Sequence, residues 1–251
     1  MRKLFLALTI IMFSSFVLAA PASANHSWGG YHWARTANPF TLQLGDNLSP
    51  DWDPFLTTTS SDWSQSAILD THIAAGQGGK TCKATTGRVE VCNKKYGRNG
   101  WLGIAQIYLS GSHITKGLTK VNDTYFSTPT YNTAAWKNLV MCQEVGHNFG
   151  LDHQDENFDN ANLGTCMDYT SNPESNQHPN QHDYDQLATI YSHTDSFTSV
   201  SAALTTLNHG QDVGEDPSSW GKLVRQNGAT AVYEKDFGNG QKLLTHVFYA
   251  L

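Results

Sequence analysis

One stretch, residues 144–153 with the sequence "EVGHNFGLDH", constrains the fold more than any other part of the chain. The preceding residues carry apolar side chains at helical spacing, so we expect a helix over residues 133–150. His147 then lies on the inner face of the last helical turn. Gly150 tolerates the positive φ that turns a chain sharply after a helix. That turn is expected to bring His153 back toward His147.

Two imidazoles that converge in this way form half of a metal site. Gln143 lies one helical turn before His147 and faces the same point, so the ligand set we predict is Gln143, His147 and His153. Zn²⁺ is the cofactor we expect, because imidazole nitrogen is one of its preferred ligands. Glu144, next to Gln143, is the predicted general base toward a metal-activated water. A single histidine on a helix is usually a packing or surface residue, but the combined spacing favours a site.

The pattern E-x-x-H-x-x-G-x-x-H, followed by "GTCMDY" at residues 164–169, resembles the metzincin zinc endopeptidases of the adamalysin and astacin type. The resemblance spans residues 31–193. It implies an α+β fold with a mixed five-stranded sheet, an active-site helix and a C-terminal helix. It also implies that Met167 forms a turn beneath the metal and that Tyr169 approaches the zinc and steadies an oxyanion. A peptide substrate would lie antiparallel along an edge strand, for which "WLGIAQIYL" at 101–109 is the candidate.

Gln143 is the departure from that family, whose motif begins with His-Glu. A neutral amide oxygen is a weak zinc ligand compared with an imidazole nitrogen. Two functions remain open: a secreted zinc endopeptidase that hydrolyses peptide bonds, and a catalytically impaired pseudoprotease that binds peptides or proteins. A third possibility is that a distant histidine supplies the missing ligand. The candidates by their order along the chain are His113, His178 and His182.

The first 24 residues are typical of a secretory signal peptide. A basic start is followed by an apolar run and by "PASA", which predicts cleavage after Ala24 and a secreted protein. An uncleaved membrane anchor is the alternative, and the short apolar run disfavours it.

Four cysteines follow, and disulfides are the default in a secreted chain. Three connectivities are open, of which we favour Cys82 with Cys92 and Cys142 with Cys166.

The remaining chain predicts a zinc protease domain over residues 25–200, followed by a connector and a small β-rich extension over 201–251. A net charge of −6 gives no indication of nucleic acid or an anionic membrane as partner. We expect a monomer that acts on a peptide or protein substrate.

For the secondary structure we expect a first strand within 31–46 and a helix over 53–75 that ends at Gly76. Three strands within 87–122, a helix near 181–193 and a C-terminal three-stranded meander with turns at "QNG" and "GNG" complete the expectation.

Overall fold

The computed structural model describes residues 26–200 and 213–251, so the predicted signal peptide and part of the predicted connector lie outside the described residues. A mixed sheet forms the centre of the molecule, in the order β3-β2-β4-β6-β5-β9-β8-β7, with β1 paired to the start of β6. The strands are β1 His32–Trp33, β2 Phe40–Asn47, β3 Leu69–Ala75, β4 Val89–Lys94, β5 Trp101–Ser110, β6 His113–Asn122, β7 Lys222–Asn227, β8 Thr230–Gly238 and β9 Gln241–Tyr249.

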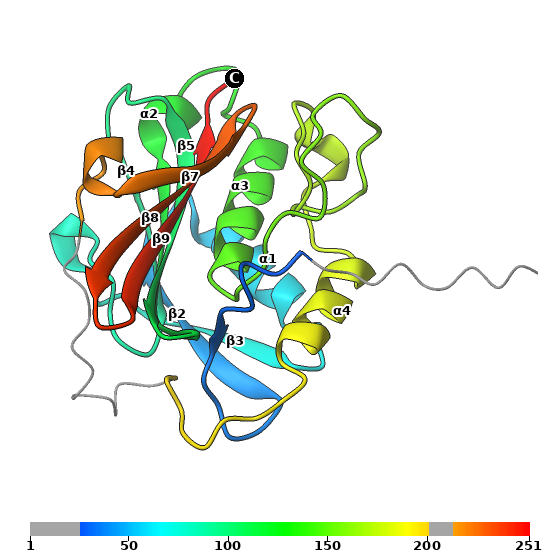
Figure 1. Ribbon diagram of the computed structural model, residues 1–251. Helices are drawn as coiled ribbons and strands as arrows, with labels where there is room; N and C mark the ends of the chain where they lie inside the picture. The colour runs from blue at the N-terminus through cyan, green and yellow to red at the C-terminus, as the bar shows by residue number, and fades with distance from the viewer. Residues whose placement is uncertain (1–25, 201–212) are drawn as a thin grey trace, which may run out of the picture.

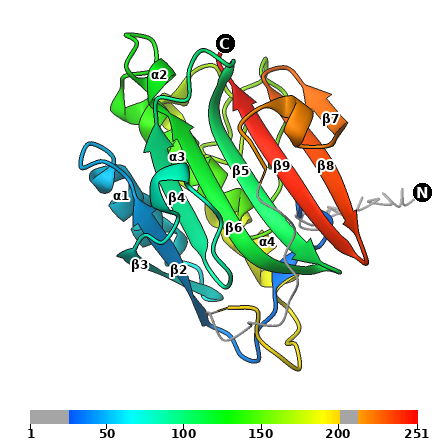
Figure 2. The ribbon, with the colours of Figure 1, turned by 90° about the vertical axis from the view of Figure 1, so that its left-hand side faces the viewer.

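The helices gather on one face of this sheet, as Figures 1 and 2 show. They are α1 Asp53–Trp63, the short α2 Asp123–Phe126, α3 Ala134–His147 and α4 Gln181–Ile190, with 3₁₀ turns at Gly79–Thr81, Pro173–Ser175 and Pro217–Ser219. The α3 helix begins as predicted, because the Thr133 side chain accepts a hydrogen bond from the Trp136 amide and so caps the first turn. Its buried apolar face packs against α1 and β5.

The predicted α+β class is confirmed. Strands β3, β2, β4 and β6 run parallel, and β5 pairs antiparallel with β6, which makes the expected mixed five-stranded unit. The C-terminal meander also forms, as β7, β8 and β9. Its last strand pairs antiparallel with β5 from Trp101 to Ser110, so the meander extends the same sheet.

Two expectations about secondary structure are wrong. The helix predicted over 53–75 ends at Trp63, and its second half is strand β3, which pairs with β2 from Leu69 to Ala75. Strand pairing along that whole segment outweighs an apolar spacing that was only approximately helical. The second error is the edge strand, because β5 lies between β6 and β9 and offers no free edge to a peptide. A strand with no charged residue is poorly suited to an exposed edge.

Both predicted disulfides are confirmed. Cys82 is bonded to Cys92, and Cys142 is bonded to Cys166. The second bond ties the middle of α3 to the turn that carries Met167. Among the described residues, no helix has the length and apolar character needed to cross a bilayer.

Candidate metal centre

The turn predicted after α3 is present and places two histidines together. Gly150 has a φ of +92°, and a Cβ there would lie 2.0 Å from the Tyr31 carbonyl oxygen, so only glycine fits. The reversal brings the His153 ring to 4.6 Å from the His147 ring, measured between centroids. The local sequence alone therefore assembles half of the candidate centre.

The third histidine of the centre comes from the other end of the chain. His246 lies on β9, where it pairs with Ala105 of β5 on one side and Val232 of β8 on the other. Its ring centroid is 4.0 Å from that of His147 and 4.7 Å from that of His153. One ligand nitrogen from each of the three histidines lies within 4.8 Å of the other two. Sequence reasoning missed His246; its only local signal is a lone histidine within the apolar run "LLTHVF".

The hydrogen bonds of these rings leave nitrogen lone pairs directed into the centre. His147 Nδ1 lies 2.9 Å from the Leu151 carbonyl oxygen, so it carries the proton and Nε2 keeps its lone pair. His246 Nδ1 lies 3.1 Å from Glu144 Oε2, which gives the same tautomer when Glu144 is ionised. Both Nε2 atoms, and both ring nitrogens of His153, are buried and have no hydrogen-bond partner within the described chain. Buried polar atoms without partners each cost about 1–3 kcal/mol, and a bound cation would satisfy them.

Burial also holds the three rings in the form that binds metals. Desolvation lowers the pKa of His147 well below its ordinary value, and the neighbouring imidazoles add to this effect. Burial lowers the pKa of His153 to about 3, against the opposing effect of the Asp152 carboxylate, whose Oδ1 lies 3.4 Å from His153 Nδ1. Burial likewise lowers the pKa of His246 to about 3. All three imidazoles are therefore neutral near pH 7, as metal ligation requires.

Glu144 is the carboxylate beside this cluster. It is fully buried between α3 and β5, and the close approach depends on Gly103, where a Cβ would lie 2.9 Å from Glu144 Oε1. Burial raises the pKa of Glu144 to about 8, although His147 lowers it in part. Its Oε2 contacts His246, while Oε1 has no hydrogen-bond partner among the described residues. One oxygen thus orients a ring and the other remains available for a proton.

Gln143 is buried on the same helix, one turn before His147. Its amide nitrogen donates to the Cys166 carbonyl at 2.7 Å, which fixes the side chain against the turn that carries Met167. The amide oxygen is buried without a partner in the described chain. Met167 lies beneath α3, because a Cβ at Gly146 would come within 2.8 Å of its sulfur. The role of Gln143 as a ligand stays a prediction, and His246 now competes for it.

Tyr169 lies at the rim of the centre. Its ring packs on His153 with centroids 4.1 Å apart, and its hydroxyl is hydrogen-bonded to the Thr230 hydroxyl of β8. Burial raises the pKa of Tyr169 above its ordinary value, so it stays a neutral phenol. Its predicted catalytic role stays a prediction, since this structure engages the hydroxyl elsewhere.

The three distant histidines proposed from chain order lie in other places. His178 pairs with Asp62, with His178 Nδ1 2.6 Å from the carboxylate oxygen. His182 groups with His26 and Asp183 at the start of α4, and His113 contacts Asp195. None of them joins His147 and His153.

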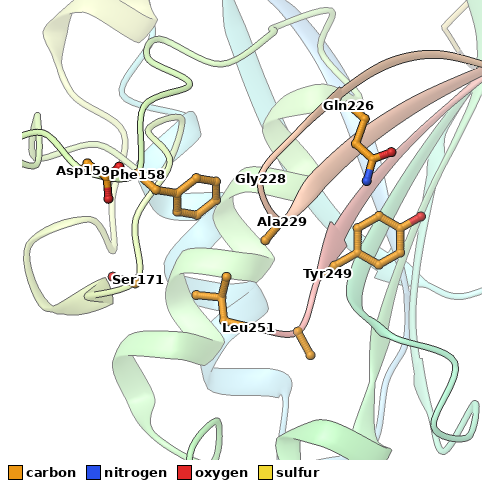
Figure 3. Close-up of a pocket in the computed structure, with 9 residues that line it drawn as sticks. Phe158, Asp159, Ser171, Gln226, Gly228, Ala229, Tyr249 and Leu251 are labelled. Atoms are coloured by element: carbon orange, nitrogen blue, oxygen red, sulfur yellow. The ribbon is translucent and has the colours of Figure 1, made fainter.

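An open cavity of about 610 Å³ lies near the centre and is shown in Figure 3. It lies between the loop that carries Phe158 and the C-terminal end of the chain at Leu251, with Gly228 and Ala229 on the turn from β7 to β8. Phe158 packs on Tyr169 at 5.0 Å, so two aromatic rings separate this cavity from His153. None of the proposed ligands lines it.

Comparison with known proteins adds little to this description. No protein-family model and no curated protein sequence matches the chain. Among solved structures, that of myroilysin matches with 14% sequence identity and a TM-score of 0.36, over 64% of this chain and 97% of the other. At this level of likeness the match identifies neither the family nor the activity.

Proposed function

We propose that the chain is a secreted zinc-dependent peptidase whose metal is held by His147, His153 and His246. The observation that carries the proposal is the convergence of three neutral, buried imidazoles whose free nitrogens lack partners. Three histidines are a common protein ligand set for a zinc ion that keeps one position open. When bound in such a site, Zn²⁺ lowers the pKa of a water molecule to about 7 and polarises a carbonyl group.

Within this proposal Glu144 is the general base. Burial raises the pKa of Glu144 to about 8 in the metal-free chain, so the carboxyl group is mostly protonated near pH 7 and a nearby cation is needed to ionise it before it can take a proton from water. Its Oε1 is free to accept that proton, while Oε2 keeps the His246 ring in the tautomer that presents Nε2. A neighbouring cation favours the ionised form, so metal binding prepares the base for its task.

Access of a peptide to the centre requires movement. Glu144, His147, His153 and His246 are at most 5% exposed, and β9 fills the side of β5 on which a peptide was expected. The Phe158 and Tyr169 rings lie between His153 and the open cavity. A peptide that enters from this cavity therefore reaches Glu144 when these rings move aside.

The burial of the centre is also the observation that favours the second candidate function. In that alternative the chain is a pseudoprotease that keeps the metal as a structural element and binds a peptide or protein in the cavity of Figure 3. Its natural form would bind zinc without hydrolysing peptides.

Cleavage of a mixed peptide library by the purified mature protein separates the two functions. The peptidase proposal expects cleavage that a chelator stops, that added Zn²⁺ restores and that Glu144→Ala abolishes while zinc stays bound. Glu174→Ala, which removes an exposed carboxylate, is the matched control and should cleave like the natural protein. Equal cleavage by natural protein and Glu144→Ala, or none by either, contradicts the peptidase proposal.

A further inference from the structure

A second group of histidines gathers around Asp195, and none of its members belongs to the candidate centre. We name it the Asp195 cluster; it consists of His32 on β1, His113 on β6, and His193 and Asp195 in the segment after α4. We propose that His32, His193 and Asp195 bind a divalent cation of the zinc class.

The distances among the three ligand atoms fit one ion. His32 Nε2 lies 3.1 Å from His193 Nε2 and 3.6 Å from Asp195 Oδ1, and His193 Nε2 lies 3.9 Å from the same oxygen. Ligands about 2.0–2.1 Å from a tetrahedral zinc ion lie about 3.3 Å apart, so small side-chain adjustments close the site. The two rings stand at 89° to each other with centroids 4.6 Å apart, so they approach one another without a clash.

The surroundings of the cluster prepare these atoms for ligation. His32 Nδ1 lies 2.9 Å from the Gly30 carbonyl oxygen, so in the neutral ring the proton sits there and Nε2 offers its lone pair to the cluster. Asp195 Oδ2 accepts from the amide and the Nη1 atom of Arg35, at 3.1 and 3.0 Å. Its other oxygen, Oδ1, is thereby turned toward the histidines.

His113 supports the same carboxylate. Its Nε2 lies 3.1 Å from Asp195 Oδ1, and its ring meets the His32 ring edge to face, with centroids 4.9 Å apart. We therefore assign His113 to positioning Asp195. Water would take the fourth place on the ion, because the His193 side chain is about half exposed to solvent (49%).

The donor atoms define the class of ion. Two imidazole nitrogens and one carboxylate oxygen suit Zn²⁺ and neighbouring transition metals, whereas Ca²⁺ and Mg²⁺ prefer all-oxygen sites. An ion here would tether the segment after α4 to β1, two parts of the chain that are some 160 residues apart. Such a cross-link closes a long loop, and closing a long loop lowers the conformational entropy of the unfolded chain more than closing a short one does.

A network of hydrogen bonds without metal is the competing explanation. It accounts for the two contacts of 3.1 Å, with His193 donating to His32 and His113 donating to Asp195. It leaves the lone pair of His32 Nε2 facing the lone pairs of Asp195 Oδ1 at 3.6 Å, an arrangement that a cation between them stabilises.

The test is the zinc content of the mature protein after loading with Zn²⁺ and desalting, measured by mass spectrometry. We expect His193→Ala and His193→Gln each to lose one equivalent of zinc per chain relative to the natural protein. Glutamine keeps an N–H donor but is a weak zinc ligand, so it separates ligation from hydrogen bonding. His178→Ala is the matched control, since His178 is also half exposed beside a single aspartate, and it should keep all the zinc.

The result that overturns the proposal is an unchanged zinc content in either His193 variant. A second measurement uses the natural protein and so does not depend on whether the variants fold. Adding Zn²⁺ to protein labelled with ¹⁵N-histidine should shift the ring-nitrogen resonances of His32 and His193. Unshifted resonances would also overturn the proposal. Loss of zinc through His147→Ala reports on the candidate centre instead, so failure of the two proposals is distinguishable.

Discussion

The identity of the third ligand at the candidate centre can be decided by two matched variants, His246→Ala and Gln143→Ala. Both residues are fully buried, and each has one polar atom without a partner among the described residues, His246 Nε2 and Gln143 Oε1. We expect that only the first variant loses zinc affinity, because imidazole nitrogen is the stronger zinc donor.

The expected loss follows from the free energy of zinc binding. The binding free energy of structural zinc is about 10–16 kcal/mol, so each of four ligands contributes about 3 kcal/mol. The loss of one ligand in His246→Ala should therefore weaken zinc affinity roughly 100-fold. Gln143→Ala removes the hydrogen bond to the Cys166 carbonyl, at a cost of about 1 kcal/mol in the free energy of unfolding, and should change zinc affinity by less than about threefold.

The assay is competition for Zn²⁺ against a chromophoric chelator, with every variant made in the His193→Ala background so that the Asp195 cluster does not contribute. Unfolding in urea checks that each variant is folded. If Gln143→Ala weakens zinc binding while His246→Ala leaves it unchanged, the glutamine is the third ligand and our assignment of His246 is refuted. If neither variant changes the affinity, the centre does not hold the metal.

Two further predictions concern stability. Arg225→Ala should lower the free energy of unfolding at pH 7 by about 2 kcal/mol, a value between those typical of a surface ion pair and of a buried one. The Arg225 side chain is 37% exposed, and its Nη1 lies 2.7 Å from Asp152 Oδ2. Burial alone would raise the pKa of Asp152, but the nearby His153 ring and the hydrogen bonds from Arg225 hold this pKa well below its usual value. This stability is therefore present above about pH 4 and is lost as the pH falls further. Urea unfolding at pH 7 and pH 3 should show the difference from the natural protein shrinking, and a constant difference contradicts the assignment. Gly150→Ala should lower the free energy of unfolding by more than about 3 kcal/mol, since a Cβ there meets a backbone oxygen. Gly111→Ala, at a φ of +61° in open space, should lower it by only about 1 kcal/mol. Similar urea midpoints for the two variants would contradict the steric argument.

The parts of the centre that lie close together in the chain were predictable from the sequence. The helix, the turn at Gly150 and the approach of His153 to His147 follow from helical periodicity and from the conformational freedom of glycine. The favoured cysteine pairing, one of three that the sequence leaves open, is also present, and each of its bridges joins nearby segments. These features depend on local geometry, which the order of residues fixes directly.

Features that depend on pairing between distant strands were not predictable. Strand β3 was read as the continuation of a helix, since its partner β2 is invisible to a local pattern. The position of β5 inside the sheet depends on β9, more than 130 residues further along the chain. The arrival of His246 beside His147 depends on the same pairing, and a register shift of one residue would turn its side chain to the other face of the sheet.

The same pairing limits how the candidate centre can open. Strand β9 fills the side of β5 where a peptide would otherwise lie, and it also carries His246, so its departure would remove a proposed ligand along with the cover. A peptidase built in this way cannot be opened by releasing its C-terminal strand. The side that faces the cavity has no such constraint, because Phe158 and Tyr169 close it through ring packing and the hydrogen bond of Tyr169 to Thr230. Under the peptidase proposal, substrate entry from the cavity of Figure 3 would leave all three histidines in place.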